Sequence, residues 1–87
     1  MTSMEFTATP EFLEVYTILD DPTAECVDRA IRRVLVQPDS AWARQNRVVG
    51  ELGSSWLIAL RCHGHDLALY WRQVDAESVE LLLLLRQ

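Results

Sequence analysis

The stretch Trp56-Leu57-Ile58-Ala59-Leu60-Arg61-Cys62 begins the part of the chain that decides the fold. A short loop containing Gly64 follows, and then comes the run Leu67-Ala68-Leu69-Tyr70-Trp71-Arg72-Gln73-Val74. Two runs of strand length around a short glycine-containing loop predict a hairpin. Beyond a second polar turn at residues 75–78, the nearly continuous apolar run Val79-Glu80-Leu81-Leu82-Leu83-Leu84-Leu85 predicts a third strand, buried on both faces.

Two amphipathic helices are predicted before these strands. Their apolar stripes, at helical spacing, are Phe12, Val15, Tyr16 and Leu19 in the first and Val27, Ile31, Val34 and Leu35 in the second. The first helix opens at Pro10, and the second follows an N-cap at Asp21 and ends at Gln37-Pro38. An edge strand is expected at Glu5–Thr9, and a short strand or an extended connection at Arg47–Val49, followed by a turn at residues 50–53.

This order of elements predicts an α+β fold in a single domain over residues 1–87. Two antiparallel helices would pack on one face of a mainly antiparallel sheet of about four strands. The predicted shared core consists of Val27, Ile31, Leu35, Ile58, Leu60 and Leu83. Trp56 and Trp71 alternate with aliphatic residues on neighbouring strands, so we expect core or cross-strand partners.

The two cysteines, Cys26 and Cys62, fall inside predicted regular elements at core-facing positions. Free cysteine in such places behaves as a small hydrophobic residue, so we expect two reduced, buried thiols rather than a disulfide. Reduced thiols are typical of the cytoplasm, which is the predicted localisation. Residues 1–10 lack the charge and apolar region of a signal peptide, and no apolar run approaches the ~18 to 20 residues of a membrane span.

The formal net charge of −5 combines eight arginines with no lysine. Non-specific binding to nucleic acid requires cationic side chains that displace counterions from phosphates. Arg29, Arg32 and Arg33 cluster on the second predicted helix, but a solvated polar face explains them better than a phosphate site. We therefore expect no direct binding of nucleic acid.

Several short segments together resemble the RelE/ParE superfamily of toxin-antitoxin toxins. They are Glu11-Phe12 at the helical pair, Gly50-Glu51-Leu52-Gly53 before Trp56–Arg61, and Leu60-Arg61 with Gly64 and Leu69-Tyr70. The similarity extends over almost the whole chain and implies a toxin neutralised by an antitoxin whose amphipathic segment wraps the helices and the sheet. In the ribosome-dependent ribonucleases of this family, cationic residues occupy the positions that match Leu57, Ala59 and Asp66. The resemblance therefore implies a member without the usual basic catalytic residues.

An alternative catalytic set consists of Arg61, His63, His65 and Arg86, near Asp66. A histidine with a pKa near neutrality could serve as acid or base in RNA cleavage. Polar residues are expected at a hairpin tip for solubility alone, however, so we favour no catalytic residue. Two imidazoles from a turn also supply too few fixed ligands for a specific metal site, and we expect neither metal nor cofactor.

Trp42 lies in a polar loop that also carries Arg44 and Arg47. A tryptophan in such a loop is either an interface anchor or a lid on the core, and we predict these three residues as a partner-binding set. The preferred function is that of a RelE/ParE-like protein acting through protein contacts, with a cognate antitoxin or another protein as partner. The alternatives are an RNA-cleaving toxin and an acidic decoy that occupies a basic site on a larger complex.

Overall fold

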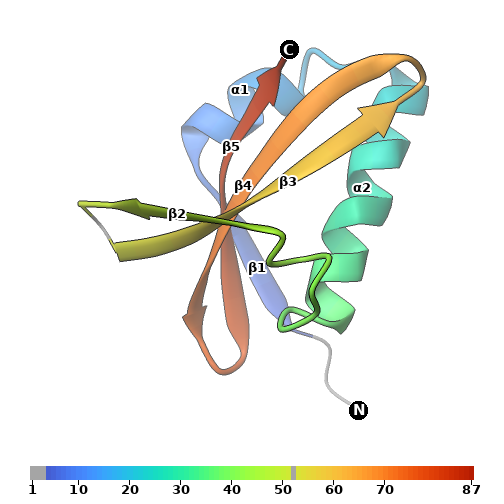
Figure 1. Ribbon diagram of the computed structural model, residues 1–87. Helices are drawn as coiled ribbons and strands as arrows, with labels where there is room; N and C mark the ends of the chain where they lie inside the picture. The colour runs from blue at the N-terminus through green and yellow to red at the C-terminus, as the bar shows by residue number, and fades with distance from the viewer. Residues whose placement is uncertain (1–3, 52) are drawn as a thin grey trace.

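The computed structural model describes residues 4–51 and 53–87. Within these residues the elements, in chain order, are β1 (Glu5–Ala8), α1 (Pro10–Tyr16), α2 (Asp21–Val36), β2 (Asn46–Gly50), β3 (Gly53–Cys62), β4 (His65–Asp75) and β5 (Ser78–Arg86). The strands form one sheet in the order β1-β5-β4-β3-β2, in which β1 runs parallel to β5 and the other pairs are antiparallel. Figure 1 shows α2 lying along one side of this sheet and the β2–β3 hairpin projecting from it.

The predicted α+β class and the mainly antiparallel sheet are confirmed, but the sheet has five strands where we predicted about four. The short segment after α2 is a true strand, because β2 pairs with β3 from Asn46 to Gly50. Leu52, in the middle of the predicted turn that follows, lies outside the described residues. The β3–β4 connection is the two-residue turn His63-Gly64, with φ values of 51° and 82°. Positive φ at both central residues is the geometry that matches the twist of the flanking strands.

Both helices begin at side-chain caps. The Thr9 hydroxyl accepts a hydrogen bond from the Phe12 N–H at 3.1 Å, and the Asp20 carboxylate accepts one from the Thr23 N–H at 2.9 Å. The N-cap of α2 is therefore Asp20 rather than the predicted Asp21, and Asp21 is the first helical residue. These bonds satisfy N–H groups that have no partner inside the helix.

The core lies between the helices and one face of the sheet. The apolar stripe of α2 was correctly predicted, because Val27, Ile31 and Val34 are buried and Leu35 packs against the same core. The remaining buried members of this core are Phe12, Ala43, Ile58, Cys62, Leu67, Leu69, Trp71, Val79, Leu81 and Leu84. Trp56 pairs with Trp71 across β3 and β4, as expected of cross-strand partners.

Two predictions for β5 are wrong. Leu83 is not in the shared core, and the strand is not buried on both faces. A register shift between Tyr70 and Trp71 leaves Leu82 without a direct partner, so Leu81 and Leu84 both face the helices while Leu83 lies opposite Tyr70 on the other face. A β-bulge of this kind breaks the two-residue alternation on which the prediction relied.

The two cysteines form a disulfide, which overturns the prediction of two reduced thiols. Cys26 in the second turn of α2 is bonded to Cys62 at the end of β3, 36 positions along the chain. Both positions do face the core, but they face each other there, with Cα atoms 5.7 Å apart. The expectation of a cytoplasmic protein rested in part on reduced cysteines, and the disulfide removes that support.

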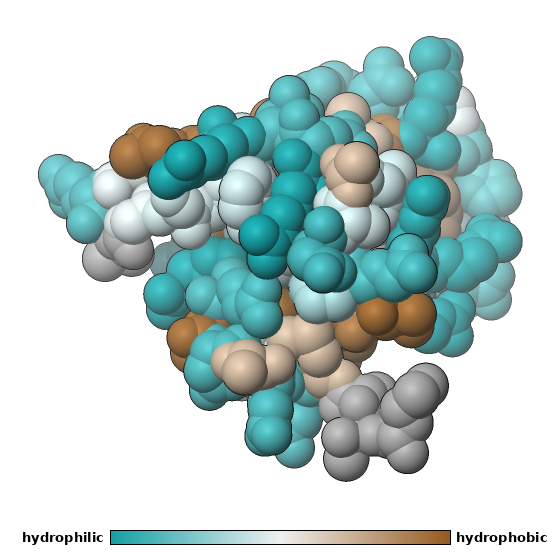
Figure 2. Space-filling view, turned by 60° about the horizontal axis from the view of Figure 1, so that its bottom comes forward, coloured by the Kyte–Doolittle hydropathy of each residue, from teal (hydrophilic) through white to brown (hydrophobic). Residues whose placement is uncertain are grey.

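One end of the molecule has a mostly polar surface. Figure 2 views the molecule from the end at which β1 begins and α2 ends, and the apolar groups on this side form separate patches within hydrophilic surface. The larger exposed apolar side chains include Phe6, Val36 and Val49. None of the helices formed by the described residues is long and apolar enough to span a membrane.

Candidate functional site

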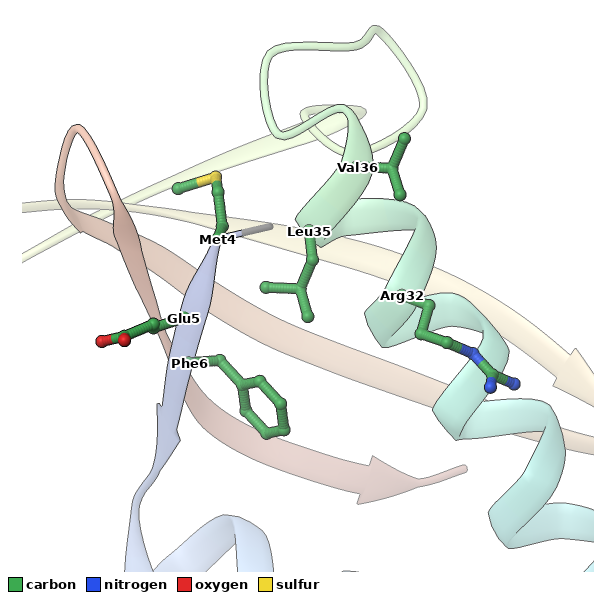
Figure 3. Close-up of a pocket in the computed structure, with 6 residues that line it drawn as sticks. All are labelled: Met4, Glu5, Phe6, Arg32, Leu35 and Val36. Carbon is green, nitrogen blue, oxygen red and sulfur yellow. The ribbon is translucent and has the colours of Figure 1, made fainter. Parts of the chain in front are cut away.

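One hollow formed by the described residues is a groove between β1 and the second half of α2. It has a volume of about 640 Å³ and is lined by Met4, Glu5, Phe6, Arg32, Leu35 and Val36. In Figure 3, Phe6 projects from β1 toward α2 and Leu35 projects from α2 toward β1, while Glu5 points away from the helix. The floor is therefore apolar, and Arg32 stands at its helical edge.

The groove exists because β1 and α2 pack imperfectly at this end of the molecule. Phe6 lies on the helix-facing side of β1, beside Val79 of β5, yet its side chain remains 49% exposed. Val36 follows the last residue of the apolar stripe and is 77% exposed. Burying an aromatic or branched aliphatic side chain contributes about 1.5 to 3 kcal/mol, so these exposed groups offer binding energy to a partner.

The groove continues along α2 through two smaller hollows. Phe6, Arg32 and Leu35 also line the first of them together with Asp28 and Ile31, and Asp28, Arg32, Glu25 and Arg29 line the second. The Tyr16 hydroxyl donates a hydrogen bond to Asp28 at 2.7 Å, and this bond raises the pKa of Tyr16. Asp28 is thereby held toward α1.

Among the described residues, no close ion pair neutralises the arginines along this groove. Within residues 4–51 and 53–87, the ion pairs join Arg61 to Asp66 at 3.8 Å and Arg72 to Glu80 at 2.7 Å. Arg29 and Arg32 belong to neither pair. A carboxylate on a bound molecule could therefore pair with either guanidinium without displacing an existing partner.

The outer edge of β1 is a second feature of the groove. β1 is the last strand on its side of the sheet. The N–H groups of Glu5 and Thr9 donate to carbonyls of Glu77 and Leu81 on the β5 side. Since alternate residues of a strand direct their backbone groups to opposite edges, Phe6 and Ala8 direct theirs outward. An unpaired edge of this kind can take an additional strand.

The alternative catalytic residues all lie at one end of the sheet but on different faces. Arg61 is opposite Asp66, while His65 is opposite Cys62 and Arg86 is opposite Leu67. Because Cys62 and Leu67 belong to the core, His65 and Arg86 are on the helix side, whereas Arg61 and Asp66 are on the other side. His63 is in the turn, and all of these side chains are exposed. The structure therefore brings the set near one edge without converging it on a single point.

The open face of the sheet, which carries no helix, has a hollow of about 360 Å³ next to the β2–β3 hairpin. Arg72 and Leu82 line it together with residues of that hairpin. The Arg72 guanidinium donates to the Glu80 carboxylate at 2.7 Å, so the positive charge of Arg72 is already paired. Leu57 and Ala59, which the resemblance matches to cationic positions, lie on this same face. This face offers no unpaired cation for a phosphate at those positions.

The predicted partner-binding set consists of Trp42, Arg44 and Arg47. These residues make contacts that stabilise the loop between α2 and β2 and the hairpin after it. Trp42 is half-buried against the core, and the Arg33 guanidinium lies over its ring at 4.1 Å. Arg44 donates to the Pro38 carbonyl at 2.9 Å and to Gln73 at 3.0 Å, and Arg47 donates to the Ser54 hydroxyl at 2.8 Å. Each residue thus has internal partners, and a role of the set in binding stays a prediction.

The sequence reasoning did not identify the groove. The available signals were Phe6 in a strand that we placed at the sheet edge, and Val36, which extends the apolar stripe of α2 by one residue. Only the packing of β1 against α2 brings the two segments together. Among the described residues, no group of three or more His, Cys, Asp and Glu side chains is placed to hold a metal ion.

Comparison with known proteins adds no relative. No family model, no curated protein and no solved structure matches the chain.

Proposed function

We propose that this chain is a RelE/ParE-like protein that acts by binding another protein, and that the groove between β1 and α2 receives the partner. The observation that carries the proposal is the apolar groove beside the outer edge of β1, with Arg29 and Arg32 on its helical side, outside the ion pairs that the described residues form. The order of strand, two helices, short strand and three further strands, on which the resemblance partly rests, also supports it.

The bound segment is extended, apolar on one side and acidic. Its backbone adds to β1 through the outward groups of Phe6 and Ala8. Its apolar side chains cover Phe6 and Leu35, and at least one carboxylate pairs with Arg32 or Arg29. Glu25 and Asp28 line the same stretch of α2, so the acidic segment is recognised by the individual guanidinium groups of Arg29 and Arg32 and not by a net positive charge of the groove.

Selection from a displayed library of random peptides tests this proposal without knowledge of the natural partner. We expect enriched peptides that alternate apolar residues with Asp or Glu. Phe6→Ala should weaken their binding about thirtyfold, since a buried aromatic anchor contributes about 2 kcal/mol or more. Arg32→Gln should weaken the acidic peptides specifically, and Val49→Ala, an exposed change on the opposite edge strand, is the matched control.

The proposal fails if the enriched peptides bind the Phe6→Ala and Arg32→Gln variants as well as the parent chain. Peptides that respond only to changes on the open face would move the binding site there. Circular dichroism of each variant distinguishes a lost contact from a lost fold.

RNA cleavage is the alternative activity, and it requires cationic stabilisation of the transition state in addition to an acid and a base. Arg61 is paired with Asp66 and Arg72 with Glu80, which argues against it. The assay is messenger RNA cleavage in a translating extract. If the protein cuts messenger RNA at codon positions and the His65→Ala variant does not, RNA cleavage would become the preferred function in place of protein binding.

A further inference from the structure

We propose that the Cys26–Cys62 disulfide is a thiol-operated switch that releases the first turns of α2 from the β3–β4 hairpin. The switch lies at the end of α2 that is remote from Leu35 and Val36. The switch does not depend on the proposed function, because it concerns only a conformational change within this chain.

The position of the disulfide makes it a latch between two elements. Cys26 is in the second turn of α2, and Cys62 is the last residue of β3, directly before the His63-Gly64 turn. Figure 1 shows the tip of the β3–β4 hairpin beside the beginning of α2. Around this contact, Arg61 and residues 63–66 are exposed, so Cys62 is the buried residue of the hairpin tip.

The first turn of α2 contains a destabilising group. Thr23 is only 3% exposed, and its hydroxyl oxygen Oγ1 has no hydrogen-bond partner among the residues that the structure describes. A buried hydroxyl without a partner destabilises the closed state, and opening of the turn would hydrate it. The disulfide keeps this turn closed against that tendency.

The second half of α2 is held independently of the latch. Ala30, Ile31 and Val34 are buried beneath it, and Trp71, Leu81 and Leu84 fill the core on the sheet side. The sheet itself is held by its own strand pairing over five strands. Val27, which is fully buried, belongs to the same core, so opening is expected to stop before Val27 and to leave the remainder folded.

The exposure of the two cysteine residues sets the direction of the exchange. Cys62 is 1% exposed, whereas Cys26 is partly exposed. The thiolate of a small thiol attacks Sγ of Cys26, the S–S bond breaks, and Cys62 leaves as a thiolate that takes up a proton. A second thiolate attacks the outer sulfur of the mixed disulfide, which yields the disulfide of the small thiol and returns Cys26 as a thiol. The small thiols thus supply two electrons, and the protein accepts them.

Hydrogen exchange measured by mass spectrometry on the full chain, oxidised and then reduced with dithiothreitol, tests the switch. We expect the reduced protein to exchange at least about tenfold faster over residues 21–26, with unchanged protection in β4 and β5, and to recover on reoxidation. With glutathione as the probe, peptide mapping should find the mixed disulfide on Cys26 and not on Cys62.

Thr23→Val provides the matched control, because it removes the unpartnered hydroxyl and keeps the shape of the side chain. In the reduced state this variant should open about tenfold less often than the parent chain. Equal exchange over residues 21–26 in both redox states would overturn the switch. Loss of protection through all strands at once would also overturn it, and would show that the disulfide is a structural crosslink.

Discussion

Trp71→Phe should destabilise the fold by about 2 to 4 kcal/mol. Trp71 is fully buried in β4, and its indole N–H donates to the Ala43 carbonyl at 2.9 Å. Ala43 is also fully buried, so phenylalanine leaves that carbonyl without this partner, at a cost of about 1 to 3 kcal/mol. The smaller ring also leaves a cavity of about 40 Å³, which at ~24 cal/mol per Å³ adds about 1 kcal/mol.

Urea unfolding followed by far-ultraviolet circular dichroism measures this loss, in buffer without reductant so that the disulfide stays intact. Trp56→Phe is the control, because Trp56 is the cross-strand partner of Trp71 but is only partly buried. It contacts the Arg44 guanidinium at 5.0 Å, so its replacement should cost about 1 kcal/mol or less. If Trp71→Phe costs no more than Trp56→Phe, the Ala43 hydrogen bond does not anchor the loop to the sheet.

Two further predictions concern the helix face and acid stability. Ile31→Ala should lower the free energy of unfolding by about 2 to 4 kcal/mol, because Ile31 lies on the buried face of α2. Val36→Ala should change it by no more than about 0.5 kcal/mol, because Val36 is 77% exposed. Equal losses in urea unfolding would mean that the buried face of α2 is misassigned. The Asp75 carboxylate accepts from the Glu77 N–H at 2.8 Å and from the Ser78 hydroxyl at 2.9 Å, which lowers the pKa of Asp75. A carboxyl group whose pKa is lower in the folded state than in the unfolded state stabilises the fold at a pH above its unfolded-state pKa. This contribution disappears as the pH falls through the folded-state pKa. Asp75→Asn should therefore flatten the decline of the melting midpoint between a pH of about 5 and 2, and an unchanged slope would exclude Asp75 as a cause of that decline.

The elements of the fold could be predicted because local signals agree with one another. The spacing of Val27, Ile31 and Val34 predicts the buried face of α2, and the glycine-containing turn predicts the β3–β4 hairpin. Both signals depend on residues close together in the chain. The same holds for Trp56 and Trp71, whose pairing follows from the short turn between their strands.

The wrong predictions depend on contacts between distant segments. A run of leucines does not reveal that Leu82 is bulged, so the side of the sheet on which Leu83 lies could not be deduced. The spacing of Cys26 and Cys62 is compatible with both a disulfide and two free thiols, and only the packing of α2 on β3 brings them together. The groove was missed for the same reason, since β1 and the end of α2 meet only in the folded chain.

The distribution of charge links the missed groove to the unpaired arginines. Arg33 stacks on Trp42 and Arg44 bonds within its loop, so these two guanidinium groups stabilise the fold. Arg29 and Arg32, by contrast, stand along the groove outside any ion pair of the described residues, although the chain contains more acidic than basic residues. A solvated polar face, which we predicted for this cluster, has no need of an apolar floor beside it. The combination of Phe6, Leu35 and Arg32 is the reason that we propose a binding groove here in place of such a face.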